Sequence, residues 1–187
     1  MSNILTLKKS SVSGVVPTAG SLAAGEPTLN YADAILFAKD SAGVVRRWIS
    51  ETIAATNANA GSIVIGQPVY QKTTSGSVDL AKADSAGAST WKCLGLVANA
   101  TVATTAAGAV QMSGPITLTA AQIAACVDGA PTALVPGTEY FVSSSNAGKL
   151  STTCPAAGSG SHICRVGVAL TTLVLKIDIQ FRGKRGA

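Results

Sequence analysis

Charged residues are scarce in this sequence. Asp, Glu, Lys and Arg make up only 12% of the 187 residues, whereas an ordinary soluble domain has about 25%. A protein with so few charges needs a surface rich in Ser and Thr, or a surface that an assembly covers. Ala, Gly, Ser and Thr together make up almost half of the chain. No apolar run approaches the ~18 residues of a membrane-spanning helix, so we expect no membrane partner.

Aromatic residues are also rare, and this argues against a nucleic-acid partner. The chain has three Phe, three Tyr and two Trp, whereas nucleic-acid surfaces combine clustered basic residues with stacking aromatics. The net charge is +5, but the basic residues are scattered, and the densest group is Arg182, Lys184 and Arg185 near the end. We interpret this group as part of a solvated, flexible tail over residues 182–187.

The residues that usually carry catalysis are either missing or isolated. The nine acidic residues include no close pair that could divide the general acid and general base roles. The single histidine, His162, accompanies no nucleophile-elbow motif. Gly158 and Gly160 precede a predicted strand, whereas a phosphate-binding loop needs a helix after it. We therefore predict a protein that is not an enzyme and has no cofactor.

The four cysteines show neither a C-x-x-C pair nor the spacing of a zinc ribbon. Cys154, His162 and Cys164 lie close enough in sequence to supply three metal ligands. A fourth ligand would have to come from far away, from Cys126 or Cys93. A disulfide between Cys154 and Cys164 is the alternative to a metal site. Most often, however, such cysteines are small buried hydrophobic residues. We expect no metal, and the sequence leaves the bridge open.

Short strands and tight turns dominate the predicted structure, which indicates an all-β protein. Residues 1–50 form a small N-terminal module with strands at 27–31, 35–39 and 44–49, preceded by a short strand at 4–7 and an extended stretch over 10–25. Hairpins of this size are marginal on their own, so the module needs a partner surface. Residues 51–62 are small and polar, and we interpret them as a linker.

Residues 63–181 predict a second domain, a β-sandwich or barrel with one short helix. In the last strand, 172–181, one face carries Leu173, Leu175, Ile177, Ile179 and Phe181, and polar residues alternate on the other face. The helix is predicted at 120–127, where Thr119 can cap it. The other predicted strands lie at regular intervals: 63–70, 78–81, 92–98, 108–112, 116–118, 139–143, 149–152 and 163–170.

The N-terminal module resembles a module that recurs at the start of bacteriophage fibre and appendage proteins. The family pattern reads LKRSS…G..P....L..GE.A.N..D..L..K. The sequence departs from it at Lys9, where arginine is usual, and at Pro27. It matches at Lys8, Ser10, Ser11, Gly14, Pro17, Leu22, Gly25, Glu26, Asn30, Asp33, Leu36 and Lys39.

Residues 134–180 are similar to the ending of phage head-fibre and capsid-decoration proteins. The segment Leu134-Val-Pro-Gly-Thr-Glu-Tyr140 resembles their LTPGT.YYLS hairpin, and residues 166–180 resemble their VG.ALS.TTL.V.IQ ending. The two resemblances imply a virion structural protein, assembled in the host cytoplasm, that binds the capsid as a decoration or head-fibre trimer. The alternative is a short tail-fibre or neck adaptor that anchors a receptor-binding fibre near the portal.

The resemblance also implies which residues hold the particle. These candidate anchoring residues are Lys8, Lys9, Pro17, Gly25, Glu26, Asn30 and Asp33. A chain rich in small residues lets three backbones approach closely, in agreement with a homotrimer. A hypothesis from another functional class is that the protein is a carbohydrate-binding β-domain that recognises a host-surface glycan. Its candidate recognition residue is Trp91, because sugar sites need exposed aromatic platforms.

Overall fold

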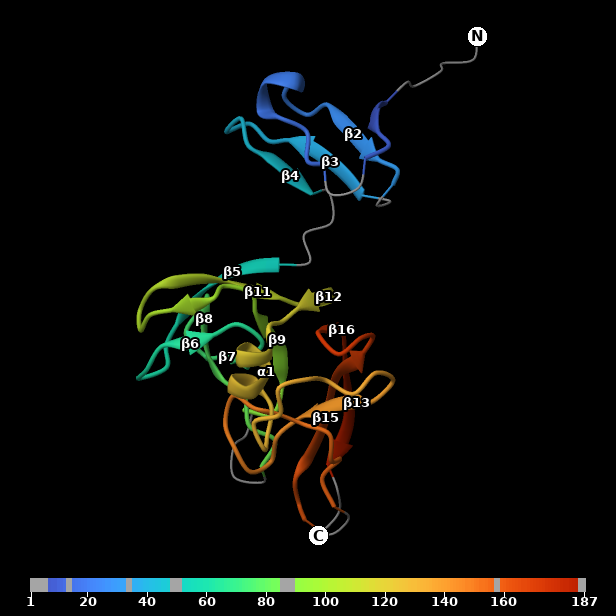
Figure 1. The fold of residues 1–187 in the computed structure, drawn as a ribbon. Helices are drawn as coiled ribbons and strands as arrows, with labels where there is room; N and C mark the ends of the chain where they lie inside the picture. Colours follow the sequence, from blue (N-terminus) through green and yellow to red (C-terminus); the bar gives the residue numbers. More distant parts are fainter. Residues whose placement is uncertain are drawn as a thin grey trace. The chain divides into compact units, whose positions relative to one another are not determined.

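The computed structural model describes residues 7–12, 15–32, 35–47, 52–84, 90–156 and 159–184 (Figure 1). The chain divides into two compact units, unit 1 over Met1–Ser50 and unit 2 over Glu51–Ala187. Strands dominate the described residues of both units, so the predicted all-β class is confirmed. None of the helices in the described part of the chain is long and apolar enough to cross a membrane.

Unit 1 is a four-stranded sheet in the order β1-β2-β3-β4. Its strands are β1 (Lys8–Ser10), β2 (Pro27–Asn30), β3 (Ile35–Lys39) and β4 (Val45–Arg47). β2, β3 and β4 pair antiparallel, as the three predicted strands require, whereas β1 pairs parallel with β2. The first strand lies at 8–10, and most of the strand predicted at 4–7 falls outside the described residues.

The parallel pair forces the chain to cross over between β1 and β2, because parallel strands cannot be joined by a tight hairpin. We call residues 11–26 the crossover segment; it contains one short 3-10 helix, η1 (Ala19–Ser21). Leu22 from this segment and Phe37 from β3 are the buried hydrophobic residues among the described part of unit 1. Thr28 and Asn30 of β2 are buried with them. The core of unit 1 is therefore small and half polar.

Unit 2 begins with a closed barrel of five strands in the order β11-β5-β8-β7-β9. The strands are β5 (Thr52–Asn57), β7 (Pro68–Gln71), β8 (Ser77–Leu80), β9 (Cys93–Val97) and β11 (Ala107–Gln111). Beside them, β6 (Ile63–Val64) and β10 (Thr101–Val102) form a two-stranded sheet. One apolar cluster fills this part of unit 2. It includes Ile63 of β6 together with Val69, Val78, Val97 and Val110 of the barrel strands.

A five-stranded sheet follows the barrel, in the order β12-β16-β15-β13-β14. Its strands are β12 (Ser113–Thr117), β13 (Glu139–Val142), β14 (Leu150–Ser151), β15 (His162–Ala169) and β16 (Val174–Lys184). In Figure 1 this C-terminal sheet is mostly orange to red, and the barrel is cyan to green. A second apolar cluster joins Leu96 of the barrel to residues of this sheet such as Tyr140, Cys164 and Leu175.

The helix and the last strand largely follow the prediction. Helix α1 (Ala120–Cys126) begins at Thr119, whose side chain accepts from the Gln122 N–H in a capping box. In β16, Leu175 and Ile177 are buried, whereas Lys176 between them and Asp178 after them are exposed. The alternation stops at the end of the strand.

The structure corrects the predicted domain boundaries in two places. Residues 52–57 of the predicted linker form β5, which pairs with β11 and β8 inside the barrel. Its buried positions are Ala55 and Asn57, and the small side chain of Ala55 suits the narrow interior of a small barrel. At the other end, the first three residues of the predicted flexible tail belong to β16, where Lys184 pairs with His162.

Candidate functional site

Two of the predicted anchoring residues hold unit 1 together. Lys8 Nζ lies 3.0 Å from Glu26 Oε1 and donates to the Ser21 carbonyl at 2.6 Å. Glu26 Oε2 accepts the Ala23 backbone N–H at 2.7 Å. That hydrogen bond, together with the one from Lys8, holds the pKa of Glu26 below its usual value. Through these contacts Lys8 connects β1 to Ser21 and Glu26, which both belong to the crossover segment.

Two further motif residues fix the path of the crossover segment. Gly25 has φ +77°, a left-handed conformation that favours glycine, and its N–H donates to the Lys39 carbonyl at 2.7 Å. Asn30 is 2% exposed, and its Nδ2 donates to the carbonyls of Val12 at 2.9 Å and Val15 at 3.0 Å. The Lys8, Glu26 and Asn30 side chains and the Gly25 backbone therefore have partners within unit 1, so these motif residues contribute to the fold of the module.

The other three candidate anchoring residues are placed differently. Lys9 is exposed on β1, and Pro17 is partly buried in the crossover segment. Both line a shallow cavity of about 150 Å³ together with Val15 and Leu22. Asp33 lies outside the described residues. Lys8 and Asn30 also line this cavity, so four of the six described candidate positions meet there, whereas Gly25 and Glu26 are not among its lining residues.

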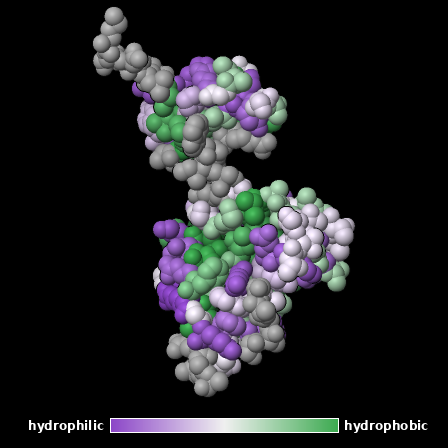
Figure 2. All heavy atoms as spheres, turned by 180° about the vertical axis from the view of Figure 1, so that it is seen from behind, coloured by the Kyte–Doolittle hydropathy of each residue, from purple (hydrophilic) through white to green (hydrophobic). Residues whose placement is uncertain are grey.

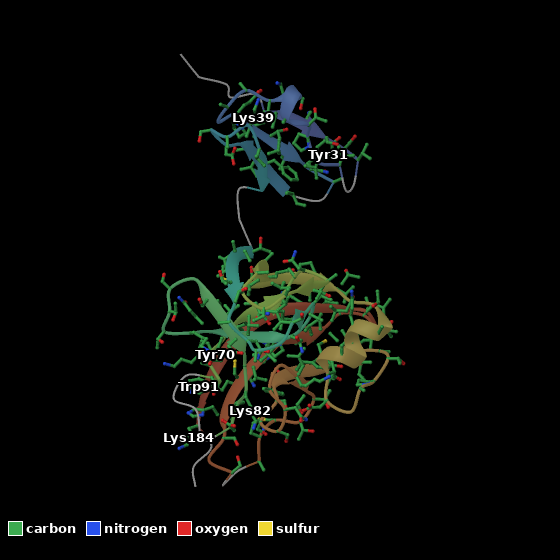
Figure 3. The ribbon with its side chains drawn as sticks, turned by 90° about the vertical axis from the view of Figure 1, so that its left-hand side faces the viewer. Tyr31, Lys39, Tyr70, Lys82, Trp91 and Lys184 are labelled. Carbon is green, nitrogen blue, oxygen red and sulfur yellow. The ribbon has the colours of Figure 1, made fainter. Side chains whose placement is uncertain are left out.

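Large apolar side chains form an exposed group around Asn30, and sequence reasoning missed them. We call Val12, Val15, Val16 and Tyr31 the crossover patch; their exposed fractions are 60%, 42%, 57% and 54%. Asn30 brings Val12 and Val15 together, because its side chain donates to both of their carbonyls, and Val16 and Tyr31 are the chain neighbours of Val15 and Asn30. Figure 2 shows hydrophobic residues at the surface of both units, and Figure 3 labels Tyr31.

A second exposed apolar group lies at one end of the C-terminal sheet. Val135, Leu170 and Leu173 are 57%, 53% and 41% exposed, and we call them the turn patch. The loop 134–137 and the turn 170–173 lie side by side, because the Leu134 N–H donates to the Thr172 carbonyl at 2.8 Å. Neither segment contains a charged residue.

Trp91, the predicted glycan platform, is partly buried in an aromatic cluster of unit 2. Its ring stacks on His162 with centroids 4.3 Å apart and an angle of 4°. Phe181 meets it in a T-shaped contact at 5.5 Å. The stack covers one face of the Trp91 ring, whereas Phe181 is 53% exposed.

Cys154 and Cys164 form no disulfide with each other, so the alternative of a bridge between them is wrong. Cys164 faces the core of unit 2 beside Cys93, whereas Cys154 is only partly buried in the loop before β15. A hydrogen bond to Cys164 and burial raise the pKa of Cys93 well above its ordinary value. Burial raises the pKa of Cys126 to about 11. Among the described residues, no group of three or more His, Cys, Asp or Glu side chains could hold a metal ion.

Comparison with models of known protein families found no match to this chain, and comparison with curated proteins also found none.

Proposed function

We propose that this chain is a structural protein of a bacteriophage virion, a capsid decoration or head-fibre protein that docks on the assembled particle through unit 1. The observation that carries the proposal is that unit 1 exposes more large hydrophobic side chains than it buries. In its described residues two large hydrophobic side chains are buried, Leu22 and Phe37, whereas the crossover patch exposes four. The resemblance of residues 7–39 to phage appendage modules points to a particle as the partner.

Docking would supply the apolar burial that unit 1 lacks. A short sheet needs more packing than one small core to be stable, and full burial of a Val side chain contributes about 1.5–3 kcal/mol. A partner that covers the crossover patch therefore stabilises unit 1 by mass action. In this view Lys8, Gly25, Glu26 and Asn30 act indirectly, because they shape the segment that presents the patch.

The turn patch supports the proposed homotrimer. The chain carries a net charge of +5, so copies repel one another unless they meet through neutral surfaces. Around a rotation axis the same residues of neighbouring copies approach one another, which disfavours charged side chains there. Val135, Leu170 and Leu173 lie on segments that have no charge. Light scattering of the full chain should give three times the 18.6 kDa mass, and Leu170→Glu should lower it.

Quantitative mass spectrometry of purified particles tests the proposed location. A high copy number, comparable to that of the major shell protein, fits capsid decoration. A low copy number assigns the chain to the neck or tail, as a fibre adaptor. Absence of the chain from the purified particle contradicts both.

Paired variants test the docking surface. Val16→Asp and Tyr31→Asp place a charge in the crossover patch and should reduce incorporation into particles. Val44→Asp is the matched control, because Val44 is also exposed, at 44%, and lies at the other end of β3 from Tyr31. Equal incorporation of all three variants would contradict docking through the crossover patch.

A further inference from the structure

Unit 2 has a groove where the barrel and the C-terminal sheet meet. The groove has a volume of about 460 Å³, within the range of roughly 300–1,000 Å³ that is typical of small-ligand sites. It is lined by Gln71 of β7, Lys92, Cys93 and Leu94 at the start of β9, and Ile179 and Phe181 of β16. None of these residues belongs to the crossover patch or the turn patch.

An exposed aromatic ring forms one wall of this groove. Phe181 is 53% exposed although it is a large apolar residue. Trp91 supports it from one side through the T-shaped contact, and His162 supports Trp91 in turn. His162 is itself fixed, because its ring Nδ1 lies 3.2 Å from the Asp84 carbonyl oxygen and its backbone N–H donates to the Ala83 carbonyl. The ring of Phe181 is therefore presented to solvent on a rigid support.

The polar groups at the groove are neutral or positive. Lys92 is exposed, and its Nζ lies 5.7 Å from the centre of the Trp91 ring, a cation–π distance that orients the ammonium group. Lys184 is also exposed and pairs in register with His162, which places it on the same side (Figure 3). Gln71 adds an amide, and no acidic residue is among those that line the groove.

We infer that this groove binds an acidic saccharide, one that carries a uronic or sialic acid carboxylate. The apolar face of a pyranose ring packs against an aromatic ring such as Phe181. An amide can donate to and accept from sugar hydroxyls, and an ammonium group forms a charge-assisted hydrogen bond with a carboxylate. Phe181, Gln71 and Lys92 supply these three groups around one groove.

A nucleic acid fits these groups less well than a saccharide. Single-stranded nucleic acids require a positive groove that follows the backbone and several stacking rings. This groove has one exposed ring and two neighbouring ammonium groups, Lys92 and Lys184. Among nearby lysines, Lys72 and Lys82 are paired with Asp79 and Asp84. The charge is local, as recognition of one carboxylate requires.

The test uses the purified full chain on an array of glycans that contain uronic acids, sialic acids or only neutral sugars, with an oligothymidylate as a further probe. We expect binding to one or more acidic glycans and weak or no binding to the neutral ones. Phe181→Ala and Lys92→Gln should each weaken that binding tenfold or more. Lys176→Gln is the matched control, because Lys176 is an exposed lysine on the opposite face of β16, and it should leave binding unchanged.

Three outcomes would overturn the inference: no acidic glycan binds, the groove variants bind as well as the control, or the oligothymidylate binds as tightly as the best glycan. Urea unfolding of each variant separates a lost contact from a lost fold. If Phe181→Ala unfolds, Gln71→Ala provides the second groove variant, because Gln71 is exposed. The assay contains no particles, so its result is independent of the proposed virion location.

Discussion

Unit 1 and unit 2 stabilise their sheets in different ways. Unit 2 has two apolar clusters, one among the barrel strands and one that joins the barrel to the C-terminal sheet. The described part of unit 1 buries two large hydrophobic side chains and relies on polar side chains that bind backbone groups, above all Lys8, Glu26 and Asn30. Such bonds define a geometry but each adds little net stability. The comparison predicts that unit 2 is the more stable unit, and the proposed docking would add the apolar burial that unit 1 lacks.

The largest expected effect belongs to the core of unit 2. Leu175→Ala removes a side chain that is 0% exposed and should cost about 2–5 kcal/mol of unfolding free energy. Lys176→Ala, at the next position and exposed, should cost less than ~0.5 kcal/mol. Urea unfolding followed by circular dichroism measures both. Equal costs would mean that the C-terminal sheet does not pack as described.

The next effect concerns the polar core of unit 1. Asn30→Ala leaves the carbonyls of Val12 and Val15 without their donor and should cost unit 1 about 1–3 kcal/mol. Hydrogen–deuterium exchange of peptides from β2 and β3 in the full chain should show faster exchange, with unit 2 unchanged. Lys9→Ala is the control, since Lys9 is exposed on β1. Faster exchange in both units would contradict the separation between them.

A smaller effect is expected from the turn before β2. Gly25→Ala forces a side chain into a left-handed conformation and should destabilise unit 1 by about 1–2 kcal/mol. Gly20→Ala is the matched control: it lies in the same crossover segment, its φ is not positive, and a Cβ there meets nothing within 4 Å. The same exchange measurement reports both variants. A Gly20→Ala variant that exchanges faster than Gly25→Ala would contradict this assignment.

The smallest effect is a pH dependence of unit 1. Bonds from Ala23 and Lys8 lower the folded-state pKa of Glu26 from 4.5, so the folded form binds the proton less readily than the unfolded form. The stabilisation is therefore present above pH 4.5 and is lost as the pH falls through the lowered pKa. Exchange of β2 peptides should accelerate in that window. Glu26→Gln should remove most of this dependence, and a wild-type profile in that variant would contradict the role of Glu26.

Several elements could be read from the sequence because a local pattern specifies them. The Thr119 cap and the alternation of Leu175 and Ile177 are examples, since each depends on neighbours in the chain. Strand β5 was missed because its small residues look like a linker, and only the closure of the barrel gives them a role. The crossover patch could not be read from the sequence, because Asn30 contacts Val12 and Val15 across 18 and 15 positions, respectively.

The location of Phe181 shows the same limit at the groove. The alternation of the last strand predicts it on the buried face, yet the sheet extends beyond the core at that point and leaves the ring exposed. The carbohydrate hypothesis predicts an exposed platform at Trp91, whereas its neighbour in space, Phe181, is the more exposed ring. Sequence spacing could not reveal this pairing, because ninety positions separate the two residues.

Hydrogen–deuterium exchange of the full chain, free and bound to purified particles, is the most direct test of the proposal that the particle completes unit 1. We predict that peptides of β2 and β3 exchange more slowly on the particle, while those of β9 and β15 in the core of unit 2 change little. Failure to bind particles, or slowing confined to unit 2, would contradict the claim.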